Sequence, residues 1–250
     1  MSLLKPLLVV TEVLCVTAVI MPLAAQTRKD PPDLTGTWAA DRRPNRDPKV
    51  TPPPAGPMTL KQPYAHQYES RRAAERQAED RGEPLANSST ACVPYGMPQM
   101  MSAIYPLEIL QTPGQITIIA EAFSEVRRIY LNEAPAKVGE VAPGYYGHST
   151  AHWNGDTLEV ETVGIKESVL GYRGMPHSDQ LRIVERFRLV APDVLHDQVT
   201  VEDPVTLEKP WTFTFAYRRT SGYKMQEYVC ENNRDYADDK GVTQLKLKDK

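Results

Sequence analysis

The sequence has few of the residues on which common catalytic and redox domains depend. Its 250 residues include three cysteines, five histidines and four phenylalanines. It contains no Cys-x-x-Cys pair, no Gly-x-Ser-x-Gly elbow, no phosphate-binding loop and no dinucleotide fingerprint. These absences argue against dithiol oxidoreductases, serine hydrolases and nucleotide-dependent enzymes, and no cofactor is predicted.

An excess of charge of one sign is also missing. The formal net charge is -3, and the basic residues are dispersed, with Arg127–Arg128 and Arg218–Arg219 as the densest pairs. Nucleic-acid-binding domains instead gather lysine and arginine on one face or stripe. No nucleic-acid partner is therefore predicted, and the oligomeric state is left open.

Long apolar runs are limited to one, from Leu7 to Leu23, which is followed by the small pair Ala24 and Ala25. This order, after a single lysine, is typical of a secretory signal peptide. Glu12 lies within the run and would be costly at the centre of a permanent membrane helix. We predict a signal peptide over residues 1–25, no stable membrane anchor, and a periplasmic or secreted protein.

Two cysteines, Cys92 and Cys230, remain after the signal peptide. In an oxidising compartment, an even number of cysteines far apart in the sequence predicts a structural disulfide. The alternative is two unpaired, buried thiols.

The mature chain changes character along its length. Prolines are frequent up to about residue 63 and deny backbone donors to helix and sheet, which predicts an extended arm. Good helix formers with few apolar residues then predict one short, solvated helix over Tyr64–Arg81. We expect a single domain in which residues 26–90, the Pro-rich arm and the helix, pack on a barrel formed by residues 91–250.

Beyond Cys92, short runs of β-branched and aromatic residues alternate with turn residues. The runs are Ala103–Gln111, Gln115–Phe123, Val126–Leu131, Gly147–Trp153, Asp156–Val163, Leu181–Val190, Leu195–Glu202 and Trp211–Arg219. They predict an all-β fold, an antiparallel up-and-down barrel, because closure removes exposed sheet edges. A sandwich of two sheets is the alternative.

Two resemblances support this fold. The segment Asp33-Leu34-Thr35-Gly36-Thr37-Trp38 resembles the glycine-tryptophan opening of lipocalin-like (calycin) barrels. Further segments resemble a family of exported bacterial proteins, namely Gly147-His148-Ser149, Trp153 to Leu158, Glu185-Arg186-Phe187, Glu202-Asp203-Pro204 with Pro210-Trp211, and Cys230-Glu231-Asn232. The resemblance implies export, a barrel and the bridge, and it transfers no catalytic residue to this chain.

The pair Asn154-Gly155 is strongly suited to a two-residue hairpin turn. With that turn, His148 lies opposite Glu161 on a polar face of the hairpin, and the other face is apolar. If the polar face is inside the barrel, Glu161 holds His148 as a general base. If it faces water, as is usual for antiparallel sheets, the two form a solvated pair of little energetic weight.

Glu185 alternates with Ile183 and Phe187 in its run and is therefore expected to point with the apolar side chains. A carboxyl group placed there has a raised pKa, which suits an acid or base near neutral pH. The alternative is a structural ion pair with an inward arginine such as Arg128.

His177 lies in a loop just before that strand, and the glycine-flanked pair Tyr172 and Arg173 precedes it and predicts a mobile flap. If His177 lies next to Glu185, the two residues form a proton-transfer pair. The alternative is that His177 is an exposed loop histidine. No metal site is predicted. The strand histidines His148 and His152 are four residues apart and therefore lie about 13 Å from each other, too far to bind one ion.

Several ring-bearing residues are candidates for a ligand pocket. They are Tyr145 and Tyr146 at a loop entry, Tyr172 with Arg173 in the flap, and Trp211 and Phe213 on one face of a strand. Alternatively, Trp211 and Phe213 only fill the core of the barrel.

Two functional hypotheses follow. In the first, the protein is a cofactor-independent lyase or isomerase that acts on a small apolar or aromatic molecule, with Glu185 and His148 or His177 as acid and base. In the second, the protein only binds or carries such a molecule.

Overall fold

The computed structural model describes residues 30–43, 47–83, 85, 87–88, 91–230, 235–237 and 243–245. The predicted signal peptide lies outside the described residues, and so do residues 26–29 and 44–46 of the predicted Pro-rich arm.

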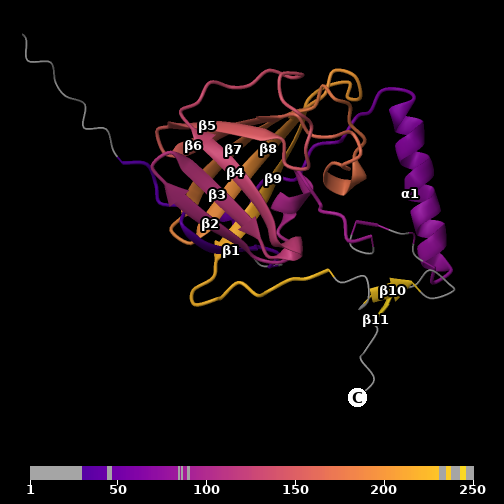
Figure 1. Ribbon diagram of the computed structural model, residues 1–250, viewed down its shortest axis with the longest axis horizontal. Helices are drawn as coiled ribbons and strands as arrows, with labels where there is room; N and C mark the ends of the chain where they lie inside the picture. Colours follow the sequence, from indigo (N-terminus) through magenta and orange to yellow (C-terminus); the bar gives the residue numbers. More distant parts are fainter. Residues whose placement is uncertain are drawn as a thin grey trace, which may run out of the picture. The chain divides into compact units, whose positions relative to one another are not determined.

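Nine strands, neighbours in the order of the sequence, close into one barrel (Figure 1). They are β1 (Gly36–Ala40), β2 (Leu107–Thr112), β3 (Gln115–Ala120), β4 (Glu125–Leu131), β5 (His148–Asn154), β6 (Thr157–Val163), β7 (Arg182–Ala191), β8 (Val194–Glu202) and β9 (Trp211–Arg219). A separate two-stranded sheet consists of β10 (Asp235–Ala237) and β11 (Thr243–Leu245). The prediction of a closed barrel is confirmed.

The prediction that the barrel is antiparallel throughout is wrong at one place. Strands β4 and β5 run parallel, with Ile129 opposite Ser149 and Leu131 opposite Ala151. A closed ring with an odd number of strands cannot alternate direction all the way round, so nine strands require a parallel pair. Residues 132–147 provide the long connection that parallel neighbours need.

The central hairpin also differs from its predicted register. Asn154 still belongs to β5 and pairs with Thr157, so the two central turn residues are Gly155 and Asp156. His148 therefore lies opposite Val163, and Glu161 lies opposite Thr150. Because the offset is two residues, every side chain keeps its predicted face while the predicted pairing of His148 with Glu161 is wrong.

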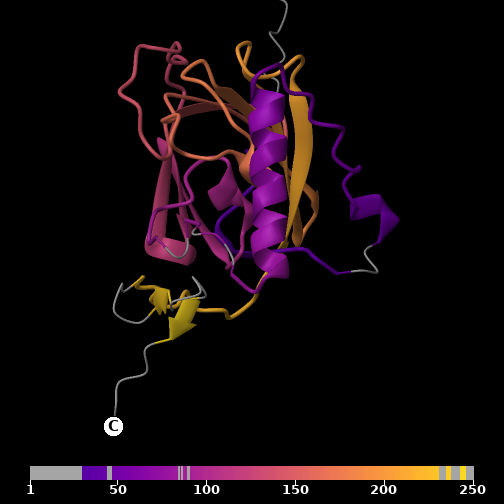
Figure 2. The ribbon, with the colours of Figure 1, turned by 90° about the vertical axis from the view of Figure 1, so that its right-hand side faces the viewer.

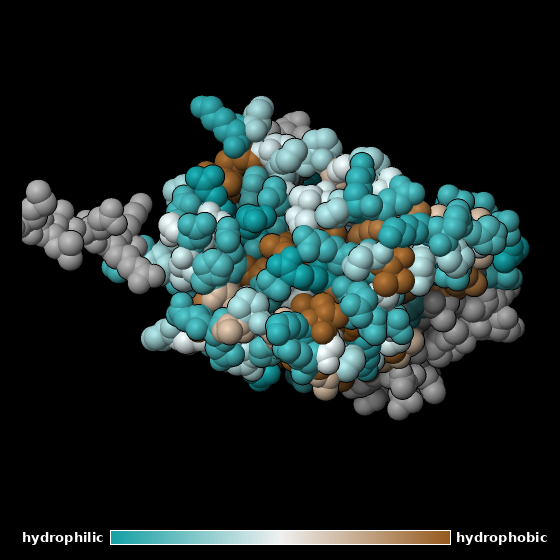
Figure 3. All heavy atoms as spheres, turned by 90° about the horizontal axis from the view of Figure 1, so that it is seen from above, coloured by the Kyte–Doolittle hydropathy of each residue, from teal (hydrophilic) through white to brown (hydrophobic). Residues whose placement is uncertain are grey.

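The apolar face of this hairpin points into the barrel. Ala151, Leu158 and Val160 belong to the hydrophobic core, which also contains the fully buried Trp38. On the face of the molecule in Figure 3, hydrophobic residues form small, separate groups among hydrophilic ones. Burial of alternate strand residues thus accounts for the core, as expected for a sheet with one solvated face.

The predicted helix is α1 (Tyr64–Asp80), a single continuous helix (Figure 2). The described residues also form four short 3-10 helices, η1 (Pro48–Val50), η2 (Gln99–Ser102), η3 (Ala122–Ser124) and η4 (Tyr172–Gly174). Helix α1 contacts η4, because Arg71 Nη2 donates a 2.6 Å hydrogen bond to the carbonyl oxygen of Gly174. Among the described residues, no helix has the length and apolar character to cross a membrane.

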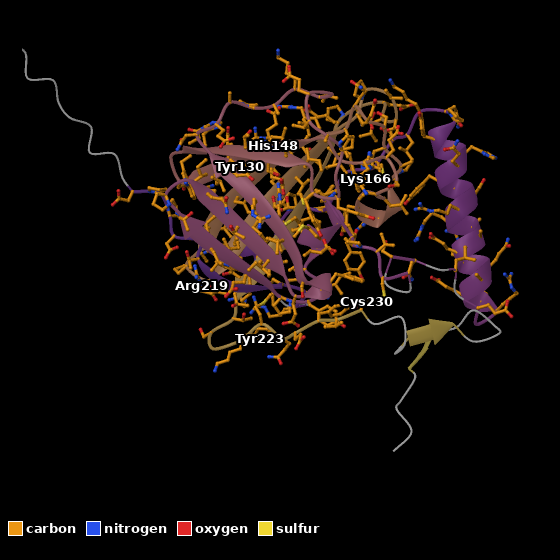
Figure 4. All side chains as sticks on the ribbon, in the orientation of Figure 1. Tyr130, His148, Lys166, Arg219, Tyr223 and Cys230 are labelled. Carbon is orange, nitrogen blue, oxygen red and sulfur yellow. A yellow bond between two sulfur atoms is a disulfide. The ribbon has the colours of Figure 1, made fainter. Side chains whose placement is uncertain are left out.

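Cys92 and Cys230 form a disulfide across a sequence separation of 138, which confirms the predicted bridge. Residues 220–230, here called the C-terminal strap, connect β9 to this disulfide; Figure 4 labels Tyr223 and Cys230 in the strap. Glu121 holds the strap by accepting hydrogen bonds from the Tyr223 hydroxyl and, at 2.8 Å, from the amide of Gln226. The disulfide fits an oxidising location outside the cytoplasm.

Candidate functional site

The barrel interior contains a buried ion pair between Arg127 on β4 and Glu185 on β7. Arg127 Nη1 donates to Glu185 Oε1 at 2.8 Å, Nη2 donates to Oε2, and both side chains are fully buried. The same guanidinium donates to the hydroxyls of Ser149 at 3.2 Å and Thr162 at 3.0 Å. The donors of Arg127 are therefore used inside the barrel, as burial of a charge requires.

The inward orientation predicted for Glu185 is confirmed, and the structure supplies the ion-pair alternative. The partner is Arg127 rather than Arg128, which lies on the exposed side of β4. Arg127 alternates in the sequence with Glu125 and Ile129, so the same alternation that indicates Glu185 also indicates Arg127.

Asp197 on β8 is a second buried carboxyl group next to this pair. Burial, and then the charge of Glu185, raise the pKa of Asp197 well above its ordinary value. The positive charge of Arg127 and the side chain of Tyr217 oppose this rise of the Asp197 pKa but are smaller effects. Protonation of Asp197 removes the cost of a second buried negative charge beside Glu185. The alternation of Leu195, Asp197 and Val199 in the sequence is the signal that would have indicated it.

Tyr217 on β9 connects this interior to a neighbouring segment. Its hydroxyl donates a 2.5 Å hydrogen bond to the carbonyl oxygen of Met101 in η2. Burial, and then the nearby charge of Asp197, raise the pKa of the Tyr217 phenol. The phenol therefore stays protonated and serves as a hydrogen-bond donor.

His148 and Glu161 lie on the outer wall and have separate partners. The ring of His148 stacks on that of Tyr130 with centroids 5.4 Å apart, and Figure 4 shows the two next to each other. Glu161 accepts a 2.6 Å hydrogen bond from Arg182, which lowers the pKa of the Glu161 carboxyl. The structure thus does not bring these two residues together as an acid-base pair.

His177 is buried rather than exposed, but its partners are carbonyl oxygens. Its Nδ1 lies 2.9 Å from the carbonyl oxygen of Ser178, and its Nε2 lies 2.6 Å from that of Val169. The Nε2 contact connects this loop to the segment that contains Val169, whereas the Nδ1 contact is with the adjacent residue. Neither contact involves Glu185, so the predicted proton-transfer pair is not formed.

Glu125, at the start of β4, is a buried carboxyl group that the sequence analysis missed. Burial raises its pKa from 4.5 to about 7, although the backbone amides of Tyr95 and Gly96 donate to it at 2.5 and 3.3 Å and oppose that rise. Burial, and then the charge of Glu125, raise the pKa of the Tyr146 phenol. Tyr146 thus packs near a carboxyl group, whereas Tyr145 lies under the ammonium of Lys166, 4.0 Å from the ring centroid.

We expect Glu125→Gln to change how stability depends on pH. The raised pKa means that Glu125 contributes stability below pH 4.5 and loses it as pH rises toward 7. A rise from 4.5 to about 7 corresponds to about 3 kcal/mol. Between pH 5 and 8, the variant should therefore gain up to about 3 kcal/mol relative to the wild type in urea unfolding. Glu133→Gln, at an exposed position, is the control, and a pH-independent difference for Glu125→Gln would contradict this expectation.

Tyr172 in η4 brings together four of the predicted ligand residues. Its ring lies 4.7 Å from that of Phe213, 4.9 Å from that of Phe215 and 6.1 Å from that of Trp211, measured between centroids. The guanidinium carbon of Arg173 lies 5.3 Å from the same ring centroid. Tyr145 and Tyr146 are not part of this group.

Two of these rings, those of Tyr172 and Phe215, line a hollow of about 370 Å³, here called the Tyr172 hollow, whereas Trp211 and Phe213 line a second hollow described below. The lining of the Tyr172 hollow includes Arg42, Gln99, Ser102, Tyr172, Phe215 and Tyr217. This hollow exists because β1 is short. Strand β1 pairs with the last three residues of β9 and ends at Ala40, while β9 continues as far as Trp211. The hollow occupies the barrel wall next to this uncovered part of β9.

A second hollow, of about 410 Å³, lies between β9 and the described proline segment. Pro53, Pro54, Trp211 and Thr212 are among its lining residues. The indole N–H of Trp211 donates a 2.9 Å hydrogen bond to the carbonyl oxygen of Gly56. The polar end of that indole is therefore already used within the protein.

No described group of three or more histidine, cysteine, aspartate or glutamate side chains is arranged to hold a metal ion. Comparison of the chain with known protein families finds no match, and comparison with curated proteins finds none either. The fold assignment therefore rests on the closed nine-stranded barrel itself.

Proposed function

We propose that this protein binds a small aromatic or apolar molecule in the Tyr172 hollow. The observation that carries the proposal is a 370 Å³ hollow whose lining combines three aromatic residues, Tyr172, Phe215 and Tyr217, with polar side chains. Small-molecule sites typically have volumes of about 300–1,000 Å³. Polar side chains, among them Arg42, Gln99 and Ser102, make up about half of the lining here and would orient a ligand. The ring of Tyr172 and the side chain of Phe215 are placed to contact a flat ligand.

Binding is better supported than acid-base catalysis. Glu185 is fully buried and bonded to Arg127, and both ring nitrogens of His177 face carbonyl oxygens of the protein. A general acid or base has to reach the proton that it transfers. The described contacts of these two residues connect parts of the protein and leave neither side chain facing the hollow.

We propose that the binding takes place outside the cytoplasm, in the periplasm or after secretion. The disulfide between Cys92 and Cys230 supports this location, because such bonds persist in oxidising compartments.

Naphthol is a suitable probe because it is a neutral, flat and fluorescent aromatic molecule. We expect it to bind the oxidised protein, and we expect Tyr172→Ala to weaken this binding by about tenfold, the typical worth of one aromatic contact. Tyr172→Phe should retain the affinity, because it keeps the ring. Isothermal titration calorimetry measures all three dissociation constants.

The control is Tyr130→Ala, which removes a tyrosine ring that stacks on His148 on the outer wall. It should leave the affinity for naphthol unchanged. The proposal is wrong if naphthol does not bind at millimolar concentration, or if Tyr130→Ala weakens binding as much as Tyr172→Ala.

A further inference from the structure

The charges around the Tyr172 hollow are not balanced. Asp41, one of its lining residues, has a side chain that is 1% exposed and already has two cationic partners. Arg43 donates to it from Nε at 2.9 Å and from Nη2 at 3.0 Å, and Arg218 Nη2 lies 3.6 Å away. These partners, the hydrogen bond from Arg43 above all, lower the pKa of the Asp41 carboxyl. The negative charge of Asp41 is therefore compensated before any ligand arrives.

The charge of Arg42, the next residue in the chain, is not compensated in the same way. It is exposed, lines the hollow, and its Nη2 lies 3.4 and 3.3 Å from the carbonyl oxygens of Ser102 and Ala103. Within the part of the chain that the structure describes, no carboxylate forms an ion pair with it. Carbonyl oxygens orient a guanidinium but do not neutralise its charge, so Arg42 keeps a full positive charge at the hollow.

Besides Arg42, the backbone of Thr214 on the uncovered edge of β9 can form hydrogen bonds at the hollow. The amide of Asp41 donates a 2.7 Å hydrogen bond to the carbonyl oxygen of Ala216, which is where the pairing with β1 ends. In an antiparallel strand, the backbone N–H and C=O of every second residue point to the same edge. The backbone of Thr214, which lines the hollow, is therefore directed to the same edge as that of Ala216.

We propose that the ligand of the Tyr172 hollow is an aromatic carboxylate, with its ring against Tyr172 and its carboxylate on the guanidinium of Arg42. This inference rests on the proposed binding function and adds the chemical class of the ligand. The planar guanidinium of arginine matches a carboxylate with two parallel hydrogen bonds. An aromatic amine would instead need a free carboxylate, and Asp41 is already occupied by Arg43.

The test compares three probes that share one ring system, namely naphthoate, naphthol and naphthylmethylamine. At low ionic strength, the wild-type protein should bind naphthoate up to about fivefold more tightly than naphthol, since an exposed ion pair contributes about 1 kcal/mol or less. This preference should decrease as salt is added, because Arg42 is exposed. Naphthylmethylamine should bind more weakly than naphthol.

Arg42→Gln should reduce the affinity for naphthoate to that for naphthol and leave the affinity for naphthol unchanged. Unchanged naphthol binding also shows that the variant is folded. Arg128→Gln is the matched control, since it removes one positive charge from the exposed side of β4 and should preserve the preference for naphthoate.

The outcomes separate this inference from the proposed function. If naphthol binds but naphthoate binds no better, or if naphthylmethylamine binds best, the carboxylate assignment is wrong while binding in the hollow remains. If Arg42→Gln retains the full preference for naphthoate, Arg42 does not recognise the carboxylate. If none of the three probes binds, the proposed function itself fails.

Discussion

Replacing Arg127 with methionine is expected to lower the free energy of unfolding by about 3–5 kcal/mol. The reason is that the fully buried carboxylate of Glu185 would lose its positively charged partner. The carboxyl group of Asp197 lies next to it and adds to the cost of the unpaired charge. Urea unfolding at neutral pH, followed by circular dichroism, measures the loss. Replacing both members of the pair, with Arg127→Met and Glu185→Leu together, should recover most of it, because no buried charge is then left unpaired.

Arg182 provides a matched control for the effect of burial. It forms 2.6 Å contacts with two carboxylates, Glu161 and Glu202, but its side chain is 35% exposed on the outer wall. Arg182→Met is expected to cost about 1 kcal/mol or less, since partly exposed ion pairs contribute little. Equal losses for Arg127→Met and Arg182→Met, or a double variant at the Arg127 pair no more stable than the single one, would contradict this account.

Removing the disulfide is expected to lower the free energy of unfolding by about 5 kcal/mol in the chain-entropy estimate for a loop of 138 residues. The bond links the segment before η2 to the end of the C-terminal strap, so its loss enlarges the freedom of the unfolded chain. The variant Cys92→Ser with Cys230→Ser, compared with the wild type by urea unfolding, measures the loss.

Reductant provides an independent check of the same prediction. It should lower the unfolding midpoint of the wild type and leave that of the double serine variant unchanged. Because Glu121 also holds the strap, through Tyr223 and Gln226, the folded strap should remain in place in the variant. A wild-type midpoint that does not respond to reductant would show that the disulfide does not contribute to stability.

Much of the fold could be predicted because its signals are local. The eight predicted runs correspond to β2 through β9, and the predicted helix Tyr64–Arg81 corresponds to α1, which ends one residue earlier. Two-residue alternation placed Glu185 inside the barrel correctly. Strand, helix and turn preferences act over a few residues, which is why a sequence alone reveals them.

The predicted site agreed less well, because a site depends on register and on contacts between distant strands. A turn displaced by one residue separated His148 from Glu161. Closure of the ring placed Arg127 of β4, rather than Arg128, against Glu185 of β7, which is 58 residues away in the sequence. The alternation of Arg127 and Asp197 with apolar residues was visible in the sequence, but nothing local showed that both would meet the same carboxylate.

The sequence by itself determined strands β2–β9, helix α1, the two cysteines of the disulfide and the inner face of β7, because alternation and residue preferences are local properties. The tertiary structure alone decided that the ring closes with nine strands and hence with one parallel pair. It also decided that β1 stops short of the start of β9 and leaves the Tyr172 hollow, which Arg42 lines. These features depend on how segments far apart in the chain meet, and only the closed barrel sets those distances.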